Sequence, residues 1–280
     1  MSQPADRGWI ADAPRLLVLS LAALVVLAPY LFMLSASVKP GGEIFEASLT
    51  LWPRHFYGVE NYIKAFTAVP LARFLLNGFV VCAVVLVLQL LFAVPCAYAL
   101  AKLRWPGRDF VFALVLLGLL IPAHVPALPL YLGFARLGLL DSYTALAAPF
   151  AISVFAVFLF RQAFKALPDE LLQAARMDGM GEMSIVWRVI MPNALPTATA
   201  FATFSIVAHW NDLFWPLSVI GSERMATPAL GVLFFRAEEA GNDTGALMAA
   251  SVITTLPMLL AFLLAQRWFV QGVATAGLKG

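Results

Sequence analysis

Charged residues are scarce in this chain. Only 12% of its 280 residues are Asp, Glu, Lys or Arg, whereas 62% are hydrophobic. A soluble domain typically carries about 25% charged residues, so this composition excludes an ordinary soluble globular protein. The formal net charge of +2 gives no basic surface of the kind that nucleic-acid binding requires. The chain therefore has the composition of a protein that lies in a membrane.

Cysteine is also scarce, and its placement excludes an internal disulfide. Cys82 and Cys96 fall on one predicted helix. Their separation along that helix is about 21 Å, whereas the Cα atoms of a disulfide lie within about 7 Å. Both thiols are expected to fill apolar space, and redox chemistry is not predicted.

The motifs of several enzyme classes are missing. No lysine follows a glycine, so the chain has no phosphate loop with which to bind and hydrolyse ATP. Its three histidines form no H-E-x-x-H pair, and no Gly-x-Ser-Gly sequence occurs. Ser205 and His209 lie one helical turn apart, but a serine bonded within its own helix is favoured over a nucleophile and base. The sequence predicts no catalytic residue, no metal site and no cofactor bound by this chain.

Long apolar runs dominate what the chain does contain. A helix needs roughly 20 apolar residues to cross a bilayer. The stretches that meet this length are Leu16–Val38, Phe74–Ala101, Phe110–Ala135, Ser142–Phe160, Val189–Asn211 and Thr244–Gln266. The sequence predicts an all-α membrane protein with about six transmembrane helices. No linker divides it, so one membrane domain is expected over residues 1–280, with its core helices at about 71–270.

The third apolar run contains three prolines. Pro122, Pro126 and Pro129 surround His124. Each proline removes a backbone hydrogen bond from a helix, so this span must be kinked or broken. Broken helices often line the path of a transporter, although a kink that serves packing alone is the other interpretation.

A polar segment, residues 165–192, separates the fourth run from the fifth. Pro168 suits the first position of a helix, and the charges of Asp169 and Glu170 suit its N-terminus. An apolar stripe of Leu171, Ala174 and Ala175 follows. Gly179 is expected to end this helix in the left-handed conformation.

A second short helix is predicted after Gly179. Its apolar residues recur at spacings of three and four, and they are Met183, Val186, Trp187, Ile190 and Met191. Two short amphipathic helices joined at a glycine and tethered to membrane spans indicate a docking element for a soluble partner.

Basic residues predict the orientation. The loop after the second span carries Lys102, Arg104 and Arg108, and the segment around residues 165–192 carries Arg161, Lys165, Arg176 and Arg188. The positive-inside rule places these loops, and with them both termini, in the cytoplasm. The segment Lys39–Arg73 is then outside, although it carries four basic residues of its own.

Polar side chains inside the spans are candidates for a solute path, because such groups are costly in hydrocarbon. Asn77 lies on the second span, His124 on the third, and the run Trp210-Asn211-Asp212 near the outer end of the fifth. Aromatic rings beside amide and carboxylate groups suit a sugar. For Asn77 an interhelical hydrogen bond is favoured over a role in binding solute. For residues 210–212 the alternative is an aromatic belt with a capped helix end.

The polar segment resembles the EAA loop of ABC importer permeases. The resemblance rests on Pro168-Asp-Glu-Leu-Leu-Gln-Ala-Ala-Arg-Met-Asp-Gly179 with Ile190-Met191-Pro192 downstream. Similar motifs occur in the carbohydrate-uptake branch of this family, in permeases like the second subunit of maltose and glycerol-phosphate systems. They are Phe74–Asn77, Trp210–Asp212 and the tail Gln266–Gly272 with Leu278–Gly280. The chain departs from the family where the leading glutamate of E-A-A is Gln173.

The resemblance implies a fold and a function. The fold would be the transmembrane domain of a type I importer in a bacterial cytoplasmic (inner) membrane. The chain would be a permease subunit that imports a sugar or sugar-like solute by alternating access. The loop 165–192 would couple it to a separate ATPase through Asp169, Glu170, Leu171, Gln173, Ala174, Ala175, Asp178 and Gly179.

The implied partners are a homologous second permease, two cytoplasmic ATPase subunits that use ATP, and an extracytoplasmic solute-binding protein. Gln173 cannot form the ion pair that a glutamate would form with a basic residue of the ATPase. Either Glu170, one turn earlier, would partly substitute for it, or the second permease would carry the intact motif. The alternative function is a secondary transporter or channel for small polar solutes.

Overall fold

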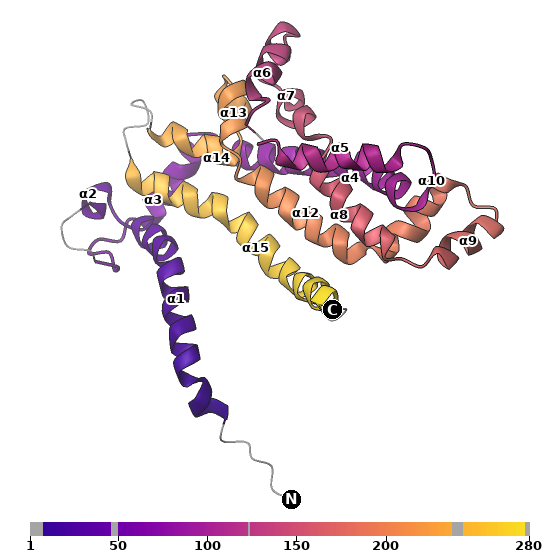
Figure 1. Ribbon diagram of the computed structural model, residues 1–280. Coiled ribbons are helices and arrows are strands. Elements are labelled where there is room, and N and C mark those ends of the chain that lie inside the picture. Colours follow the sequence, from indigo (N-terminus) through magenta and orange to yellow (C-terminus); the bar gives the residue numbers. More distant parts are fainter. Residues whose placement is uncertain (1–7, 46–49, 123, 237–242, 278–280) are drawn as a thin grey trace, which may run out of the picture. The chain divides into compact units, whose positions relative to one another are not determined.

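The computed structural model describes residues 8–45, 50–122, 124–236 and 243–277, with side chains described for Pro14–Phe235 within these ranges and for residues 243–263. All the regular secondary structure in these ranges is helical (Figure 1). The described chain packs as two compact units. Unit 1 runs up to Val69 and includes Phe235–Ile253, and unit 2 consists of Pro70–Phe234 and the chain from Thr254 onward. A single membrane domain over residues 1–280 stays a prediction.

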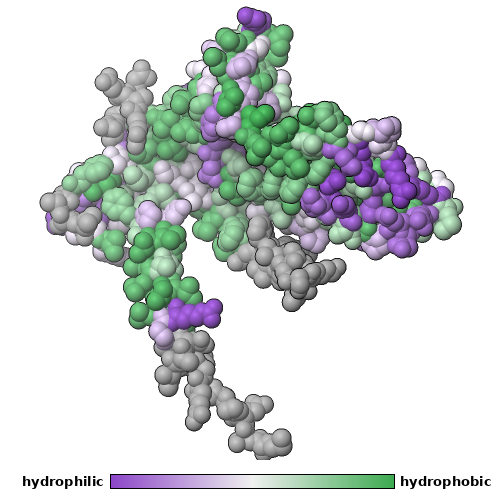
Figure 2. All heavy atoms as spheres, viewed as in Figure 1, coloured by the Kyte–Doolittle hydropathy of each residue, from purple (hydrophilic) through white to green (hydrophobic). Residues whose placement is uncertain are grey.

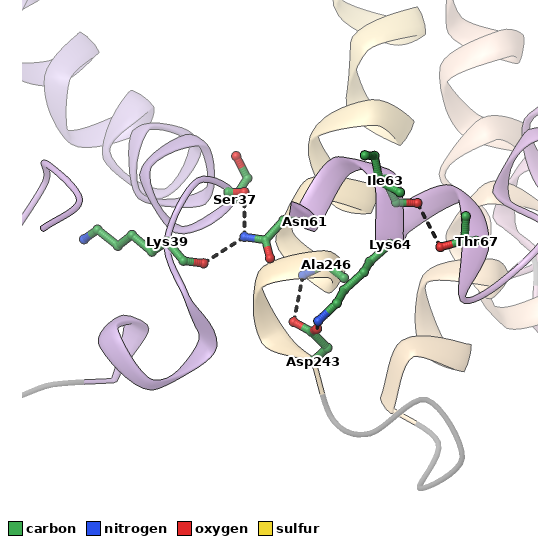
Figure 3. A network of polar contacts seen from close by, with 8 residues as sticks. All are labelled: Ser37, Lys39, Asn61, Ile63, Lys64, Thr67, Asp243 and Ala246. Atoms are coloured by element: carbon green, nitrogen blue, oxygen red, sulfur yellow. Dashed lines mark hydrogen bonds and ion pairs between the residues drawn. The ribbon is translucent and has the colours of Figure 1, made fainter. Parts of the chain in front are cut away.

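Unit 1 contains one long helix and two short ones. They are α1 (Gly8–Ala36), α2 (Gly41–Ile44) and α3 (Gly58–Thr67), joined by the first turns of α15 (Thr244–Gly277). Asn61 on α3 is buried and donates to the carbonyl oxygens of Ser37 (3.0 Å) and Lys39 (2.8 Å). Lys64, one turn further, forms a 2.7 Å ion pair with Asp243 at the start of α15 (Figure 3). These bonds fix α3 against the chain that follows α1 and against the beginning of α15.

Unit 2 is built around α4 (Leu71–Lys102), which packs most extensively on α8 (Val154–Lys165) and then on α12 (Leu195–Trp210). Ala93 and Ala97 of α4 are fully buried in the same core cluster as Phe160 and Phe164 of α8. Small residues let the backbones of membrane helices approach closely, so the two phenylalanine rings fill the space beside the alanines. A second cluster joins α4 to α7 and α13.

Apart from α15, which belongs to unit 2 from Thr254 onward, the remaining elements of this unit are short. Between α4 and α8 they are α5 (Arg108–Leu120), α6 (Ala127–Arg136), α7 (Tyr143–Ala147) and η1 (Ala148–Phe150). Between α8 and α12 they are α9 (Asp169–Met177), α10 (Glu182–Ile185), the π-helix η2 (Val186–Ile190) and α11 (Met191–Asn193). After α12 come α13 (Phe214–Val219), η3 (Glu223–Met225), α14 (Pro228–Gly231) and η4 (Val232–Arg236).

Five of the six predicted spans correspond to a long helix or to a bent pair of helices. In the described residues three helices are long and apolar enough to cross a membrane, at Pro14–Ala36, Leu71–Lys102 and Thr244–Leu263. Two bent pairs raise the number to at most five: Tyr143–Phe150 with Val154–Lys165, bent by 44°, and Glu182–Asn193 with Leu195–Trp210, bent by 85°. The fifth span was predicted to begin at Val189, but the straight helix α12 begins at Leu195, because the chain bends at Ala194.

The predicted third span, Phe110–Ala135, is divided as its prolines require. It consists of α5, with 13 residues, and α6, with 10. Ile121 takes an extended conformation (φ −79°, ψ 119°) immediately before Pro122, because a proline disfavours the helical conformation of the residue before it. Pro126 then precedes α6 as its N-cap residue. Neither helix reaches the length of about 20 residues that a bilayer demands.

Candidate functional site

The helix α9 is held at its N-terminus by a lysine from α4. The ammonium of Lys102 donates to the carbonyl oxygen of Leu167 (2.6 Å) and to the carboxylate of Asp169 (2.5 Å). The hydrogen bond and charge of Lys102 lower the pKa of Asp169. A lowered pKa means that the carboxylate stays ionised until the pH falls below its usual range. The pair therefore persists at neutral pH and ties the start of α9 to the end of α4.

Gly179 ends α9 in the manner that the sequence predicts. Its φ is +79°, the left-handed region in which glycine has no steric penalty. The amide of Met180 donates to the carbonyl of Ala175, and the amide of Gly179 donates to that of Arg176, each at 3.0 Å. These two bonds form a complete Schellman motif, which sets a sharp turn between α9 and α10.

An ion pair crosses this turn. The guanidinium of Arg176 on α9 donates twice to the carboxylate of Glu182 on α10, at 2.8 and 3.2 Å. Glu182 raises the pKa of Arg176. The hydroxyl of Tyr98, from α4, donates to the same carboxylate. Arg176, Glu182 and Tyr98 thus link α9, α10 and α4. No local sequence pattern marks Tyr98 or Glu182, because the two lie 84 residues apart in the chain.

The two faces of α9 differ in exposure. Leu172 and Ala175 are buried in the core cluster that also contains Phe160 and Phe164 of α8. Beside this buried face, Leu171, Ala174 and Met177 follow one another at spacings of three and are exposed, the last by 83%. Hydrophilic residues gather at the end of unit 2 where α9 and α10 lie (Figure 2). The exposed surface of α9 is therefore an apolar stripe bordered by charged groups.

The structure divides the residues predicted to couple the chain to an ATPase. Asp169, Glu170, Leu171, Gln173, Ala174, Asp178 and Gly179 are exposed. Ala175 is instead buried in the core of unit 2, so it is not part of the exposed stripe, and its role in coupling stays a prediction. Ala175 follows Leu172 by three residues, so both side chains point to the same face of the helix. This spacing is the sequence signal that would have indicated the burial of Ala175. Met177, three residues after Ala174, was missed on the exposed face.

A pocket of about 560 Å³ lies where three helix breaks of unit 2 meet. The breaks are at Ile121–Pro126, between α5 and α6, at Ala151–Ser153, between η1 and α8, and at Asn211–Leu213, between α12 and α13. Residues from each of them line the pocket: Ile121, Pro122, His124, Pro126, Ile152 and Asp212. At membrane depth, irregular backbone is tolerated where it is covered by protein or lines a water-filled cavity. We refer to this cavity as the three-break pocket.

Aromatic and polar side chains share the walls of the three-break pocket. Its aromatic wall includes Phe150, Phe214 and Trp215. The His124 and Phe214 rings lie edge to face at 4.5 Å, as do the His209 and Phe150 rings at 4.9 Å. The Nδ1 atom of His209 is 2.7 Å from the carbonyl oxygen of Ser205 in its own helix. One oxygen of Asp212 accepts from the amide of Trp215 at 3.3 Å.

Of the residues predicted to line a solute path, His124 and Asp212 are brought together in the three-break pocket, and three others are not. Asn77 is fully buried and has a complete set of partners. It donates to the carbonyls of Arg224 (3.1 Å) and Ala226 (2.8 Å) and accepts from the Tyr143 hydroxyl (2.6 Å). Asn77 therefore joins α4 to α7 and to the chain around η3, which is the interhelical alternative that the sequence left open.

Trp210 and Asn211 also serve the packing of unit 2. The indole of Trp210 is buried and donates to the carbonyl of Thr254 on α15 (3.0 Å). The amide of Asn211 donates to Val207 in the last turn of α12 (2.8 Å). The Ser205 hydroxyl donates to Gln89 on α4 (2.6 Å) and lies 3.4 Å from Nδ1 of His209 in its own helix. Only Asp212 of the Trp-Asn-Asp run lines the pocket.

The sequence of this chain matches a known family of transport proteins. Residues 89–275 match the family described as the inner membrane component of binding-protein-dependent transport systems. The chain belongs to this family. It is an ABC permease subunit, and its loop 165–192 and its three-break pocket both lie within the matched region.

Relatives of this permease are similar over almost their full length. The arabinooligosaccharide transport system permease protein of Halalkalibacterium halodurans is 35% identical over 92% of this chain and 93% of its own. The sn-glycerol-3-phosphate transport system permease protein of Yersinia pestis is 33% identical over 92% of this chain and 94% of its own. These similarities extend through both units.

Two solved structures share the fold. One, a bacterial ABC transporter involved in the import of the acidic polysaccharide alginate, matches with a TM-score of 0.81 at 24% identity, over 96% of this chain and 99% of the other. The second, a bacterial alginate ABC transporter bound to a periplasmic protein carrying an alginate pentasaccharide, gives 0.58 at 14% identity, over 93% and 96%. The permease thus has the type I importer fold. The C-terminal motif at Gln266–Gly272 and 278–280 lies outside the described side chains.

Proposed function

We propose that this permease imports a sugar or sugar-like solute by ATP-driven alternating access. Full-length relatives named for arabinooligosaccharide and glycerol-phosphate transport support a small polyhydroxylated solute. The observation that carries the proposal is the construction of α9, which exposes Leu171, Ala174 and Met177 while its other face is fixed in the core of unit 2. A helix with this arrangement suits a cleft on a soluble partner.

In this mechanism α9 acts as a rigid coupling helix. Closure of an ATPase dimer would move α9 together with α8, because Leu172 and Ala175 pack in the same cluster as Phe160 and Phe164. Lys102 and Tyr98 link the movement to α4, the helix at the centre of unit 2. Rigid-body movement of the bundle then exposes the solute path to alternate sides of the membrane.

The proposed assembly contains a second, homologous permease, two cytoplasmic ATPase subunits and an extracytoplasmic solute-binding protein. The chain is proposed to lie in a bacterial inner membrane with both termini and α9 in the cytoplasm. ATP is used by the partner subunits, and this chain is assigned no catalytic residue and no cofactor. Gln173 is exposed and meets the ATPase through hydrogen bonds, with Glu170 supplying the nearby charge.

Co-purification and transport together test the function. The affinity-tagged chain, expressed with its neighbouring transport genes, is expected to bring down an ATPase subunit. The complex in liposomes should take up solute only with ATP and with the solute-binding protein. Replacing Leu171 by arginine should release the ATPase, whereas the same change at Leu195, which is exposed outside α9, should not. Uphill movement of solute by this chain alone on an ion gradient would establish the secondary-transporter alternative instead.

A further inference from the structure

The three-break pocket contains a carboxylate, and its described lining includes two histidines but no lysine or arginine. Among its described lining residues Asp212 is the acidic one. Carboxylates and phosphates in proteins are usually bound by arginine or lysine side chains. The charged group of this pocket therefore has the wrong sign for an anionic solute.

The walls of the pocket suit a sugar ring. Phe150 and Phe214 supply aromatic surface, whereas Trp215 is 4% exposed and its indole N–H is used in a bond to the carbonyl of Ala145 at 2.8 Å. The exposed faces of such rings stack on the apolar face of a pyranose or furanose. The volume of about 560 Å³ falls in the range of small-molecule sites, which is about 300–1,000 Å³.

The polar groups of the pocket suit hydroxyls. Asp212 has one oxygen bonded to the amide of Trp215 and carries a second acceptor oxygen. With Nδ1 of His209 bonded to the Ser205 carbonyl, a neutral imidazole has Nε2 as an acceptor. Carboxylate and imidazole acceptors bind hydroxyl donors, whereas a phosphate dianion or a uronate has few donors to offer.

An anion in this pocket would be desolvated without a compensating cation. Burying an unpaired charge is strongly unfavourable. Repulsion from a carboxylate at about 4 Å lowers occupancy by roughly fivefold even when water screens it. Both effects act against phosphate esters and uronates, and neither acts against a neutral oligosaccharide.

We propose that the three-break pocket admits an uncharged sugar ring of the transported solute and excludes anionic solutes through Asp212. This inference rests on the proposed function, since it names the class of solute within it. It assigns the selection to the permease itself, in addition to any selection by the solute-binding protein.

A charge-sensitive labelling experiment tests the pocket without the solute-binding protein. In the assembled importer in membranes, Cys82 and Cys96 are replaced by alanine and a single cysteine is placed at Ile152, which lines the pocket and is 67% exposed. Labelling rates are compared for a cationic and an anionic methanethiosulfonate reagent. Leu137→Cys, at an exposed position outside the pocket lining, is the matched control.

At Ile152→Cys the cationic reagent should react several-fold faster, and Asp212→Asn should reduce that preference while leaving Leu137→Cys unchanged. Maltotriose or arabinotriose at millimolar concentration should slow labelling at Ile152→Cys, and sn-glycerol 3-phosphate or a mannuronate trisaccharide should not. The inference is overturned if the anions protect as well as the neutral sugars, if no neutral sugar protects, or if the preference for the cationic reagent does not depend on Asp212.

The same samples separate this inference from the proposed function. ATP-driven uptake is measured with the solute-binding protein added. Loss of all ATP dependence with an intact labelling pattern would contradict the importer, whereas normal ATP-driven uptake of a uronate or a phosphate ester would contradict only the assignment of the pocket.

Discussion

Asn77 and Asp212 are both polar side chains carried on apolar helices, yet their hydrogen bonding differs. Asn77 uses both its amide protons and its oxygen in bonds to Arg224, Ala226 and Tyr143. Asp212 has one bond, to the amide of Trp215, and lines a pocket. A buried polar group whose partners are complete stabilises the fold, whereas one with an acceptor to spare beside a cavity is available to a ligand.

Replacing Asn77 by alanine should therefore affect stability more than solute selection. The variant leaves the buried carbonyl of Ala226 and the Tyr143 hydroxyl without their partner, at a cost of about 1–3 kcal/mol, whereas the Arg224 carbonyl keeps its 3.0 Å bond from Arg73. Its apparent melting temperature in detergent should fall by several degrees relative to the parent. Asn211→Ala, which loses one bond within an exposed helix turn, should remain close to the parent. Equal melting temperatures for the two variants would contradict the structural role of Asn77.

Tyr98 links the loop 165–192 to α4 through a single hydroxyl. Tyr98→Phe removes the bond to Glu182 and keeps the ring. ATP-driven uptake should decrease by about threefold to tenfold, the effect of one partly solvated charge-assisted hydrogen bond, while basal ATP hydrolysis persists. Glu182→Ala should reduce uptake as well, and the double variant should be no worse than Glu182→Ala alone, because the two residues share one interaction. Additive losses would indicate that Tyr98 acts on something else.

At the scale of elements, the decisive feature is the turn between α9 and α10. The Schellman motif at Gly179 and the Arg176–Glu182 ion pair fix the angle between the two short helices. The buried face of α9 fixes the pair to the bundle. The turn, the ion pair and the buried face together make the loop rigid. A helix that transmits movement from a partner must be rigid in this way.

Gly179→Val tests this stiffness. No atom lies within 4 Å of a β-carbon built at Gly179, but its φ of +79° is costly for other residues by about 1–2 kcal/mol. The variant should insert in the membrane normally and lose most ATP-driven uptake. Gly181→Val is the matched control, because Gly181 also has free space and has an ordinary φ of −72°. Full uptake with Gly179→Val would show that the angle between the helices does not matter.

The breaks in the spans were only partly predictable at this scale. Three prolines in eight residues predict the interruption between α5 and α6, since each removes a backbone donor. The breaks before α8 and after α12 have weaker local signals. The three breaks line one pocket because α5, α8 and α12 pack together. No local sequence pattern specifies this packing.

At the scale of the whole molecule, orientation in the membrane decides which partner each surface meets. The basic loops predict that α9 is cytoplasmic and that the segment 39–73 is outside. In a background without Cys82 and Cys96, Met177→Cys should react with a membrane-impermeant maleimide only in inside-out vesicles. Trp52→Cys, 85% exposed in unit 1, should react only from the outside of intact cells. The reverse pattern would invert the topology and remove the ATPase from the reach of α9.

The sequence by itself determined the membrane environment, the helical class, the loop with its glycine turn and the family, because these depend on composition, on short-range spacing and on residues adjacent in the chain. It did not determine which face of α9 is buried, that Tyr98 and Glu182 meet, or that His124 and Asp212 share a pocket while Asn77, Trp210 and Asn211 hold the bundle together. Those outcomes depend on contacts between residues far apart in the chain, and only the packing of the helices on one another selects them.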